Sequence, residues 1–251
     1  LYGTIHIQDS RVFAFDSTVW HCFNSCEALA VEVLLDRLDY SVVREQMMMP
    51  KGQSIAKMLS KEDFAILDNL CKAKMGVGAL FLSNMKPFFL SSALQQADLP
   101  REEPLALDLF FLQQARNRGM YCYGLEEYMD QIKATDAISI DDQLKILRQT
   151  LHETADVAAS FDSLVLAYLA FDMTMISKML TDTTLPDNFD KVLVDKRNKT
   201  MYKGFRKIAK KQHVFCAVGA AHLPGDKGLI GLLRKKGYTV EPVTFEWKAA
   251  H

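Results

Sequence analysis

Segments with the composition of buried β-strands lie near the two ends of this chain, and helical sequence separates them. The apolar runs LYGTIHI at 1–7 and ALAVEVLL at 28–35 flank a helical segment at 16–26, in which Asp16 or Ser17 provides the N-cap. This strand–helix–strand order predicts two paired parallel strands. Further β-prone segments stand much later in the sequence, at 120–127, 212–222 and 238–247.

The sequence between these ends has the periodicity and the capping signals of amphipathic helices. Ser60 is placed to cap a helix that ends at Gly76, and Pro104 and Gly119 mark the start and the end of another. The other helices are predicted at 54–59, 84–99, 126–135, 139–159, 161–181, 201–212 and 226–237, with a break at 183–188.

We therefore expect an α/β fold in which a mostly parallel sheet is built from both chain ends and a large helical subdomain is inserted between them. No long linker divides the sequence, so residues 1–251 are predicted to form a single domain. Its α/β core is predicted at about 1–50 and 118–130 plus 212–247, and its helical block at about 51–117 and 131–211.

Charge and hydropathy argue against several classes of partner. With 30 Lys and Arg against 31 Asp and Glu, the chain has a formal charge of −1 and no basic field that would attract nucleic acid or an anionic membrane. A membrane-spanning helix needs about 20 apolar residues, and the most apolar stretch, 161–180, is interrupted by Asp162, Asp172 and Lys178. The chain starts at Leu1 inside a predicted strand; we expect an exported protein, periplasmic, secreted or surface-anchored, whose leader is absent from this chain.

Polar side chains stand at or just past the carboxyl ends of four predicted strands: His6, Glu32, Glu126 and His222. Ligands of open parallel sheets bind at this edge. Taken singly, His6 is explained by a strand-end role as often as by a ligand role, and Glu32 or Glu126 is more often a solvated or helix-capping carboxylate. Together, two imidazoles and two carboxylates suit a divalent ion such as Zn²⁺, Mn²⁺ or Co²⁺. Thiolate zinc ligands are not expected, because the five cysteines include no C-x-x-C pair.

The two histidines occur in matching Gly-x-x-His sequences that begin at Gly3 and Gly219. Glycine at these positions permits either a positive φ or a close approach of the backbone to the site, and packing beneath a helix is the structural alternative. The pair Arg197-Asn198, early in a helical stretch, has two interpretations of equal weight. It presents a guanidinium fork and an amide to a substrate carbonyl or carboxylate, or it belongs to a solvated helix face.

In order and spacing, the motifs of this chain resemble those of the TraB/GumN family, which includes the TIKI metalloproteases. The resemblance covers nearly the whole chain and rests on LYGTIHIQDSRV, MPKGQSIAKMLSKEDF, NMKPFFL, LDLFFLQQARNRGMYCYGLEEYMDQI, DKRNKTMYKGF and FCAVGAAHLPGDKGLIGLLRKKGYTVEPV. It implies a fold like that of the erythromycin-esterase and ChaN-type α/β proteins. For the TIKI branch it implies metal-dependent cleavage near the N-terminus of a secreted signalling protein. By motif it points to Gly3 and His6, Gly124, Leu125 and Glu126, Arg197 and Asn198, and Gly219 and His222.

We therefore expect a divalent-metal-dependent hydrolase that cleaves peptide bonds in a peptide or protein substrate through a metal-activated water. Arg197 and Asn198 would stabilise the oxyanion or hold the substrate. Two alternatives stay open: a non-catalytic protein of the same family that binds haem or metal or sequesters a peptide, and a metal-independent esterase with one histidine as base. The expected metal ligands are His6, His222 and either Glu126 or Glu32, the remaining carboxylate being the general base.

Overall fold

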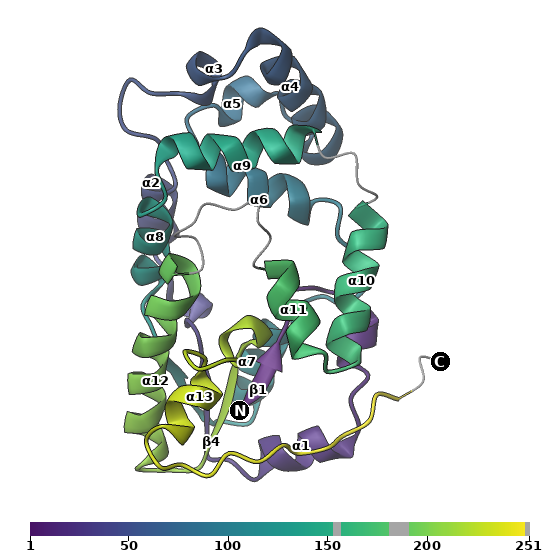
Figure 1. The fold of residues 1–251 in the computed structure, drawn as a ribbon, viewed down its shortest axis with the longest axis vertical. Helices are drawn as coiled ribbons and strands as arrows, with labels where there is room; N and C mark the ends of the chain where they lie inside the picture. The colour runs from purple at the N-terminus through teal and green to yellow at the C-terminus, as the bar shows by residue number, and fades with distance from the viewer. Residues whose placement is uncertain (153–156, 181–190, 249–251) are drawn as a thin grey trace.

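The computed structural model describes residues 1–152, 157–180 and 191–248, so the break predicted at 183–188 lies outside the described residues. The α/β class is confirmed, and so is a parallel sheet built from both chain ends (Figure 1). All strand pairs in this sheet are parallel. Its strand order is β1 (Tyr2–Thr4), β4 (Val214–Gly219), β2 (Ala28–Val31) and β3 (Tyr121–Gly124).

One expectation about the sheet is wrong, because the first two strands along the chain are parallel but do not pair. β4 lies between them, with Ala217 opposite Tyr2 on one side and Cys216 opposite Ala30 on the other. The physical reason is burial: β2 and β4 are almost entirely buried and occupy the centre, whereas β3, with exposed Tyr121 and Gly124, forms an edge. A right-handed crossover can pass over one strand position. The order of strands along the chain therefore does not determine which strands are neighbours in the sheet.

Alternate residues of β4 face opposite sides of the sheet, as the two-residue period of a strand requires. Phe215 and Ala217 belong to one hydrophobic cluster, and Cys216 and Val218 belong to another. The first cluster includes residues of α1 (Ser17–Asn24) and α7 (Leu107–Asn117), and the second includes residues of α12 (Lys196–Ala209) and α13 (Leu229–Arg234). α7 and α12 fall within the ranges that the sequence assigns to the helical block, yet both pack on the sheet.

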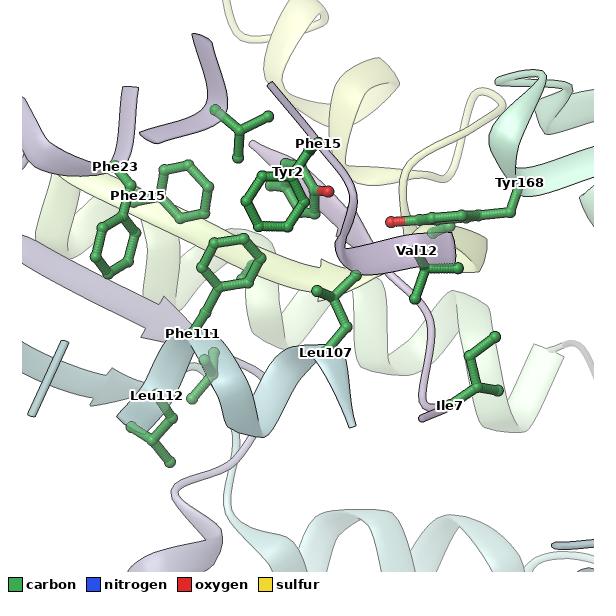
Figure 2. Packing of buried hydrophobic residues seen from close by; sticks show 14 of the residues in the cluster. Tyr2, Ile7, Val12, Phe15, Phe23, Leu107, Phe111, Leu112, Tyr168 and Phe215 are labelled. Carbon is green, nitrogen blue, oxygen red and sulfur yellow. The ribbon is translucent and has the colours of Figure 1, made fainter. Parts of the chain in front are cut away.

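Aromatic side chains dominate the first cluster, and Phe111 of α7 lies at its centre (Figure 2). Its ring is fully buried. The ring centroids of Tyr2, Phe23 and Phe215 lie 5.1, 5.6 and 5.2 Å from that of Phe111, and Phe15 stacks on it at 5.7 Å. These contacts join α7 to α1, β1 and β4, and they hold the strands whose carboxyl ends carry the polar residues.

The helical block has a core of its own at the end of the molecule away from the sheet (Figure 1). Ser60 accepts a hydrogen bond from the Asp63 N–H at the start of α4, and Gly76 ends that helix with a φ of 74°, as predicted. α7 begins at Leu107 rather than at Pro104.

No helix in the described part of the chain is long and apolar enough to cross a membrane. Besides α7, the α-helices between residues 40 and 152 are α2 (Tyr40–Gln46), α3 (Ile55–Met58), α4 (Lys61–Met75), α5 (Ala79–Leu82), α6 (Pro87–Gln96), α8 (Tyr128–Asp136) and α9 (Ile140–His152).

The single helix predicted at 161–181 is wrong, because the chain turns after Leu169 and forms α10 (Val157–Leu169) and α11 (Met173–Leu180). The turn is a Schellman motif, in which the Asp172 N–H donates to the Ala167 carbonyl and the Phe171 N–H to the Tyr168 carbonyl. Phe171 occupies the left-handed position with a φ of 56°, where glycine is usual. Its ring packs on Phe245 and Trp247. Because phenylalanine and not glycine stands at this turn, the sequence does not mark the end of the helix.

The final strand predicted at 238–247 is also wrong. Among the described residues, this segment makes only an isolated bridge between Trp247 and Phe15. Pro242 lacks the N–H that a strand needs at that position. The alternating apolar residues are instead used for side-chain packing, because Phe245 stacks on Tyr2 and the Trp247 indole donates to the Leu169 carbonyl.

Truncation of Phe111 tests the aromatic cluster. Phe111→Ala removes a fully buried ring, and we expect a loss of about 3–5 kcal/mol in the free energy of unfolding. Phe81→Ala is the matched control, because the Phe81 side chain on α5 is 88% exposed and its loss should change stability by less than about 0.5 kcal/mol. Urea unfolding followed by circular dichroism measures both. If Phe111→Ala were as stable as Phe81→Ala, the Phe111 ring would not be central to the packing of the cluster.

The ion pair between Asp9 and Arg11, close in sequence to His6, gives a prediction about how stability depends on pH. Buried Asp9 pairs with Arg11, whose guanidinium also donates to Asp162 of α10. Arg11 holds the pKa of Asp9 below its usual value, so this contribution is complete above about pH 3.9 and is lost as the pH falls through the lower folded pKa. We expect Asp9→Asn to cost about 1–3 kcal/mol near neutral pH and progressively less below about pH 3.9.

The control for this prediction is Asp162→Asn, which removes the negative charge from the second, exposed partner of Arg11. With 52% of its side chain exposed, Asp162 should contribute at most about 1 kcal/mol. Urea unfolding of both variants across the acid range makes the comparison. A stability difference for Asp9→Asn that does not change with pH would rule out the ionic contribution.

Candidate functional site

The carboxyl ends of the four parallel strands bring the sequence-derived polar residues to one edge of the sheet. His6 lies two residues after β1, and Glu32 follows β2 directly. Glu126 lies two residues after β3, and His222 ends the short 3-10 helix η4 (Ala220–His222) that follows β4. Nε2 of His6 is 4.0 Å and Nε2 of His222 is 3.6 Å from Oε1 of Glu32. Glu32 therefore stands between the two imidazoles.

Arg197 connects the two acids from the first turn of α12. Its Nη2 lies 2.5 Å from Oε2 of Glu32 and 2.5 Å from Oε1 of Glu126, and its Nε donates to Glu126 at 2.9 Å. The Glu126 side chain is fully buried, and that of Arg197 is only 15% exposed. Gln131 of α8 donates a further hydrogen bond to Glu126 at 2.9 Å. Arg197 thus faces the interior, while Lys199 on the same helix is exposed.

Asn198, the next residue of α12, orients His222. Its Nδ2 donates to the Lys227 carbonyl at 3.0 Å, so its Oδ1 is the atom that faces Nδ1 of His222 at 2.7 Å. Nδ1 of His222 must therefore carry a proton and donate it to this oxygen. In the neutral ring, the lone pair of Nε2 then points toward Glu32, which is the tautomer required of a metal ligand.

His6 has an equivalent partner in Asp108, which lies in the first turn of α7. Nδ1 of His6 is 3.0 Å from Oδ1 of Asp108, an ion-pair distance, and Nε2 faces Glu32. The two histidines differ in exposure: 59% of the His6 side chain is accessible, against 7% for His222. His222 forms the inner wall of the site, and His6 lies at its opening.

The electrostatics of the site keep Glu32 ionised. Burial opposes its ionisation, but His222, His6, Arg197 and the Gly219 N–H, which donates at 2.7 Å, lower the pKa of Glu32 to about 2. Desolvation lowers the pKa of His222 to about 4, so this ring is neutral near pH 7. Desolvation also opposes protonation of His6, but the Asp108 and Glu32 carboxylates outweigh it and raise the pKa of His6 above its ordinary value.

Gly219 leaves open the space in which these groups converge. A Cβ atom at this position would lie 3.0 Å from Oε1 of Glu32, 3.6 Å from Cδ2 of His222 and 3.7 Å from Nε2 of His6. Its φ of −51° suits any residue, so the glycine is needed for space and not for conformation. Gly3 instead packs against η4, where a Cβ would lie 3.2 Å from the Ala220 Cα. Gly124 lies beside the backbone of Glu126.

The chemistry of this donor set fits a divalent cation. Three carboxylates, of Glu32, Glu126 and Asp108, stand against the guanidinium of Arg197, so an excess of negative charge remains even when His6 is protonated. With bonds of about 2.1 Å, two ligands of one ion lie about 3.0–3.4 Å apart. No group of three or more His, Cys, Asp or Glu in the described ranges lies close enough together to hold a metal ion as it stands.

Asp108 and Gln131 were not singled out from the sequence. A signal for Asp108 existed, because it is the only charged residue in the apolar run 105–112. Gln131 carries no such signal, since it is an ordinary polar residue of an amphipathic helix and its contact with Glu126 depends on how α8 packs. The Lys227 carbonyl that orients Asn198 is a backbone group and is invisible to sequence patterns.

Comparison with known proteins gives a family and distant relatives. Residues 1–242 match the model of the TraB/PrgY/gumN family. The chain is similar to Metalloprotease TIKI2 of Danio rerio, with 24% identity over 96% of this chain and 57% of the relative. It is also similar to Metalloprotease TIKI1 of Danio rerio (23% identity, 96% of this chain, 60% of the relative) and to TIKI2 of Xenopus tropicalis (25%, 96% and 57%). The chain thus spans less than two thirds of each relative's length. No solved structure matches it significantly.

Removal of the Arg197 charge tests the buried ion network. Arg197→Met leaves Glu32 and Glu126 buried without their shared partner, and we expect it to destabilise the fold by about 3–5 kcal/mol. Lys203→Met, which removes an exposed charge from the same helix, should change stability by less than about 0.5 kcal/mol. Thermal and urea unfolding report the difference. An Arg197→Met protein as stable as the control would show that the network does not hold α12 on the sheet.

Proposed function

Because this chain belongs to the TraB/PrgY/gumN family, we propose that it is a divalent-metal-dependent hydrolase that cleaves peptide bonds in a peptide or protein substrate. One observation carries the proposal: Nε2 of His6, Nε2 of His222 and Oε1 of Glu32 converge on the space that Gly219 leaves open. The relatives named as metalloproteases support the reaction class. Since the chain spans only 57–60% of those relatives, their activity as whole proteins supports it only as a proposal here.

In this proposal His6, His222 and Glu32 hold the metal, which is Mn²⁺, Co²⁺ or Zn²⁺. When bound, such an ion polarises a substrate carbonyl and lowers the pKa of a coordinated water. Imidazole and carboxylate ligands suit all three ions. Glu126 is assigned a different role, because its carboxylate is occupied by Arg197 and Gln131 and lies fully buried.

The surrounding residues act by positioning these groups. Asn198 holds the proton on Nδ1 of His222, so that its Nε2 stays available, and Asp108 lies within ion-pair distance of Nδ1 of His6. Arg197 fixes both the place and the ionised state of Glu32. The sequence offered Arg197 and Asn198 as groups that contact the substrate, but their polar atoms are largely occupied by protein partners. We therefore assign Arg197, Asn198 and Glu126 to positioning.

The position of His6 sets the direction from which a substrate arrives. His222 and Glu32 are buried, whereas the His6 ring is largely exposed, so the carbonyl to be attacked would approach from the His6 side. The polar groups that remain open on this side belong to the ligand set itself. Export of the protein stays a prediction of the sequence.

Metal titration is the first test. Chelator-stripped protein should bind about one equivalent of Mn²⁺, Co²⁺ or Zn²⁺ in isothermal titration calorimetry. Asn198→Ala should lower the affinity about 10–100-fold through loss of the His222 tautomer. His6→Ala and His222→Ala should lower it at least as much, while exposed His21 provides the matched control, His21→Ala, with unchanged affinity. Gly219→Ala should also weaken binding, because the new Cβ would lie 3.0 Å from Glu32.

Cleavage is measured on the same proteins with a mixed peptide library, by mass spectrometry of new termini. New termini that need both metal and the two histidines support the hydrolase. Metal uptake without new termini would overturn the hydrolase and favour a binding or sequestering protein of the same family. Absence of metal uptake, or cleavage without metal that depends on one histidine alone, would overturn the metal-dependent mechanism.

A further inference from the structure

A small cavity of about 230 Å³ opens beside His6. His6 forms one of its walls, and the same ring lies 4.0 Å from Glu32. The other walls come from the segment after β1 and from the connection between α6 and α7, which includes Leu99, Leu105 and Ala106. The cavity and the candidate site therefore share the His6 ring.

Seven of the eleven residues that line this cavity are apolar, and the other four are His6, Gln8, Gln96 and Arg101. Leu99, Leu105, Ala106 and Leu109 face it, and no carboxylate lines it. The amide of Gln8 is already used, because its Nε2 donates to the Glu103 carbonyl at 2.6 Å. The cavity thus offers apolar contact beside the polar side chains of His6, Gln96 and Arg101.

The walls are held by contacts made without any ligand. The Glu102 and Glu103 N–H groups donate to the Gln8 carbonyl at 3.0 and 2.9 Å, and the Ser10 hydroxyl donates to Glu102 at 2.6 Å. Leu99 and Leu109 also pack against the aromatic cluster of the sheet. The connection between α6 and α7 is therefore fastened to the segment that carries His6, and the cavity is preformed.

Charge and size limit what this cavity accepts. Its volume is below the roughly 300–1,000 Å³ of pockets that enclose a drug-sized ligand, so it suits a single side chain. Arg101 stands at its rim and makes no hydrogen bond or ion pair with another described residue. Its positive charge, with no acid in the lining, disfavours lysine and arginine.

We propose that this cavity is a specificity subsite that binds one large apolar side chain, such as leucine, methionine or phenylalanine, of a peptide placed across His6. The inference rests on the proposed hydrolase function only for the statement that the bound residue flanks the cleaved bond. Binding of the side chain itself depends on the cavity alone. The two ideas are therefore separable by experiment.

Binding is tested with N-acetyl amino-acid amides as probes, without metal and without cleavage. N-acetyl-leucinamide should shift the methyl NMR signals of Leu105 and Leu109, whereas the glycine and lysine amides should not. Ala106→Phe places a ring at the cavity wall and should abolish the shifts. The matched control Leu80→Ala changes an exposed leucine of α5 and should leave them intact. Shifts of equal size for the lysine or glycine probe, or none for the leucine probe, would overturn the proposal.

Cleavage of the peptide library gives the second readout. The wild type should prefer a large apolar residue at one position next to the new terminus by at least about tenfold over alanine. Leu105→Ala enlarges the cavity and should move this preference toward phenylalanine and tryptophan, a change that mere destabilisation would not produce. A preference unchanged in Leu105→Ala would overturn the subsite. If the wild type cuts no peptide, the hydrolase proposal fails, and the NMR measurement still decides whether the cavity binds apolar side chains.

Discussion

Burial of one guanidinium between two carboxylates is the interaction on which the candidate site depends. Glu32 follows β2, Glu126 follows β3, and Arg197 comes from a helix on the face of the sheet, so their contacts join three elements that are far apart in the sequence. An arginine can bridge both acids because its donors form a planar fork. The same contacts fix the carboxylate that stands between the histidines. Stability and site geometry are therefore set by one buried network.

The sheet explains why these groups meet at all. All its strands run in one direction, so every strand delivers the residue after its carboxyl end to the same edge. The opposite faces are covered by helices, with the aromatic cluster around Phe111 on one side and a second cluster, which includes Met201 and Tyr202 of α12 and Leu229 and Leu233 of α13, on the other. Gly219 then keeps side-chain atoms out of the space at the centre of this edge. The polar set is open only where His6 and the apolar cavity beside it face solvent.

Much of this arrangement could be predicted from the sequence because its signals are local. Strand composition and the residues at strand ends predicted the sheet and its polar edge, and Ser60 and Gly76 marked the limits of α4. What could not be predicted depends on tertiary packing. The insertion of β4 between β1 and β2 follows from relative burial, and the turn at Phe171 is held by aromatic contacts without a glycine. The different surroundings of Glu32 and Glu126 depend on where Arg197 enters, which no motif spacing contains.

The position of β4 has a consequence for how the protein is made. β4 is the last strand in the sequence, yet it lies between β1 and β2 and is the only described strand that touches both. A ribosome-bound chain that ends before residue 214 can form the helical block and its separate core, but β1 then has no partner in the sheet. Contacts between sequence ends close late, because long loops must be ordered first. The polar edge is therefore completed only after β4 and His222 have been synthesised, well after the other three strands have left the ribosome.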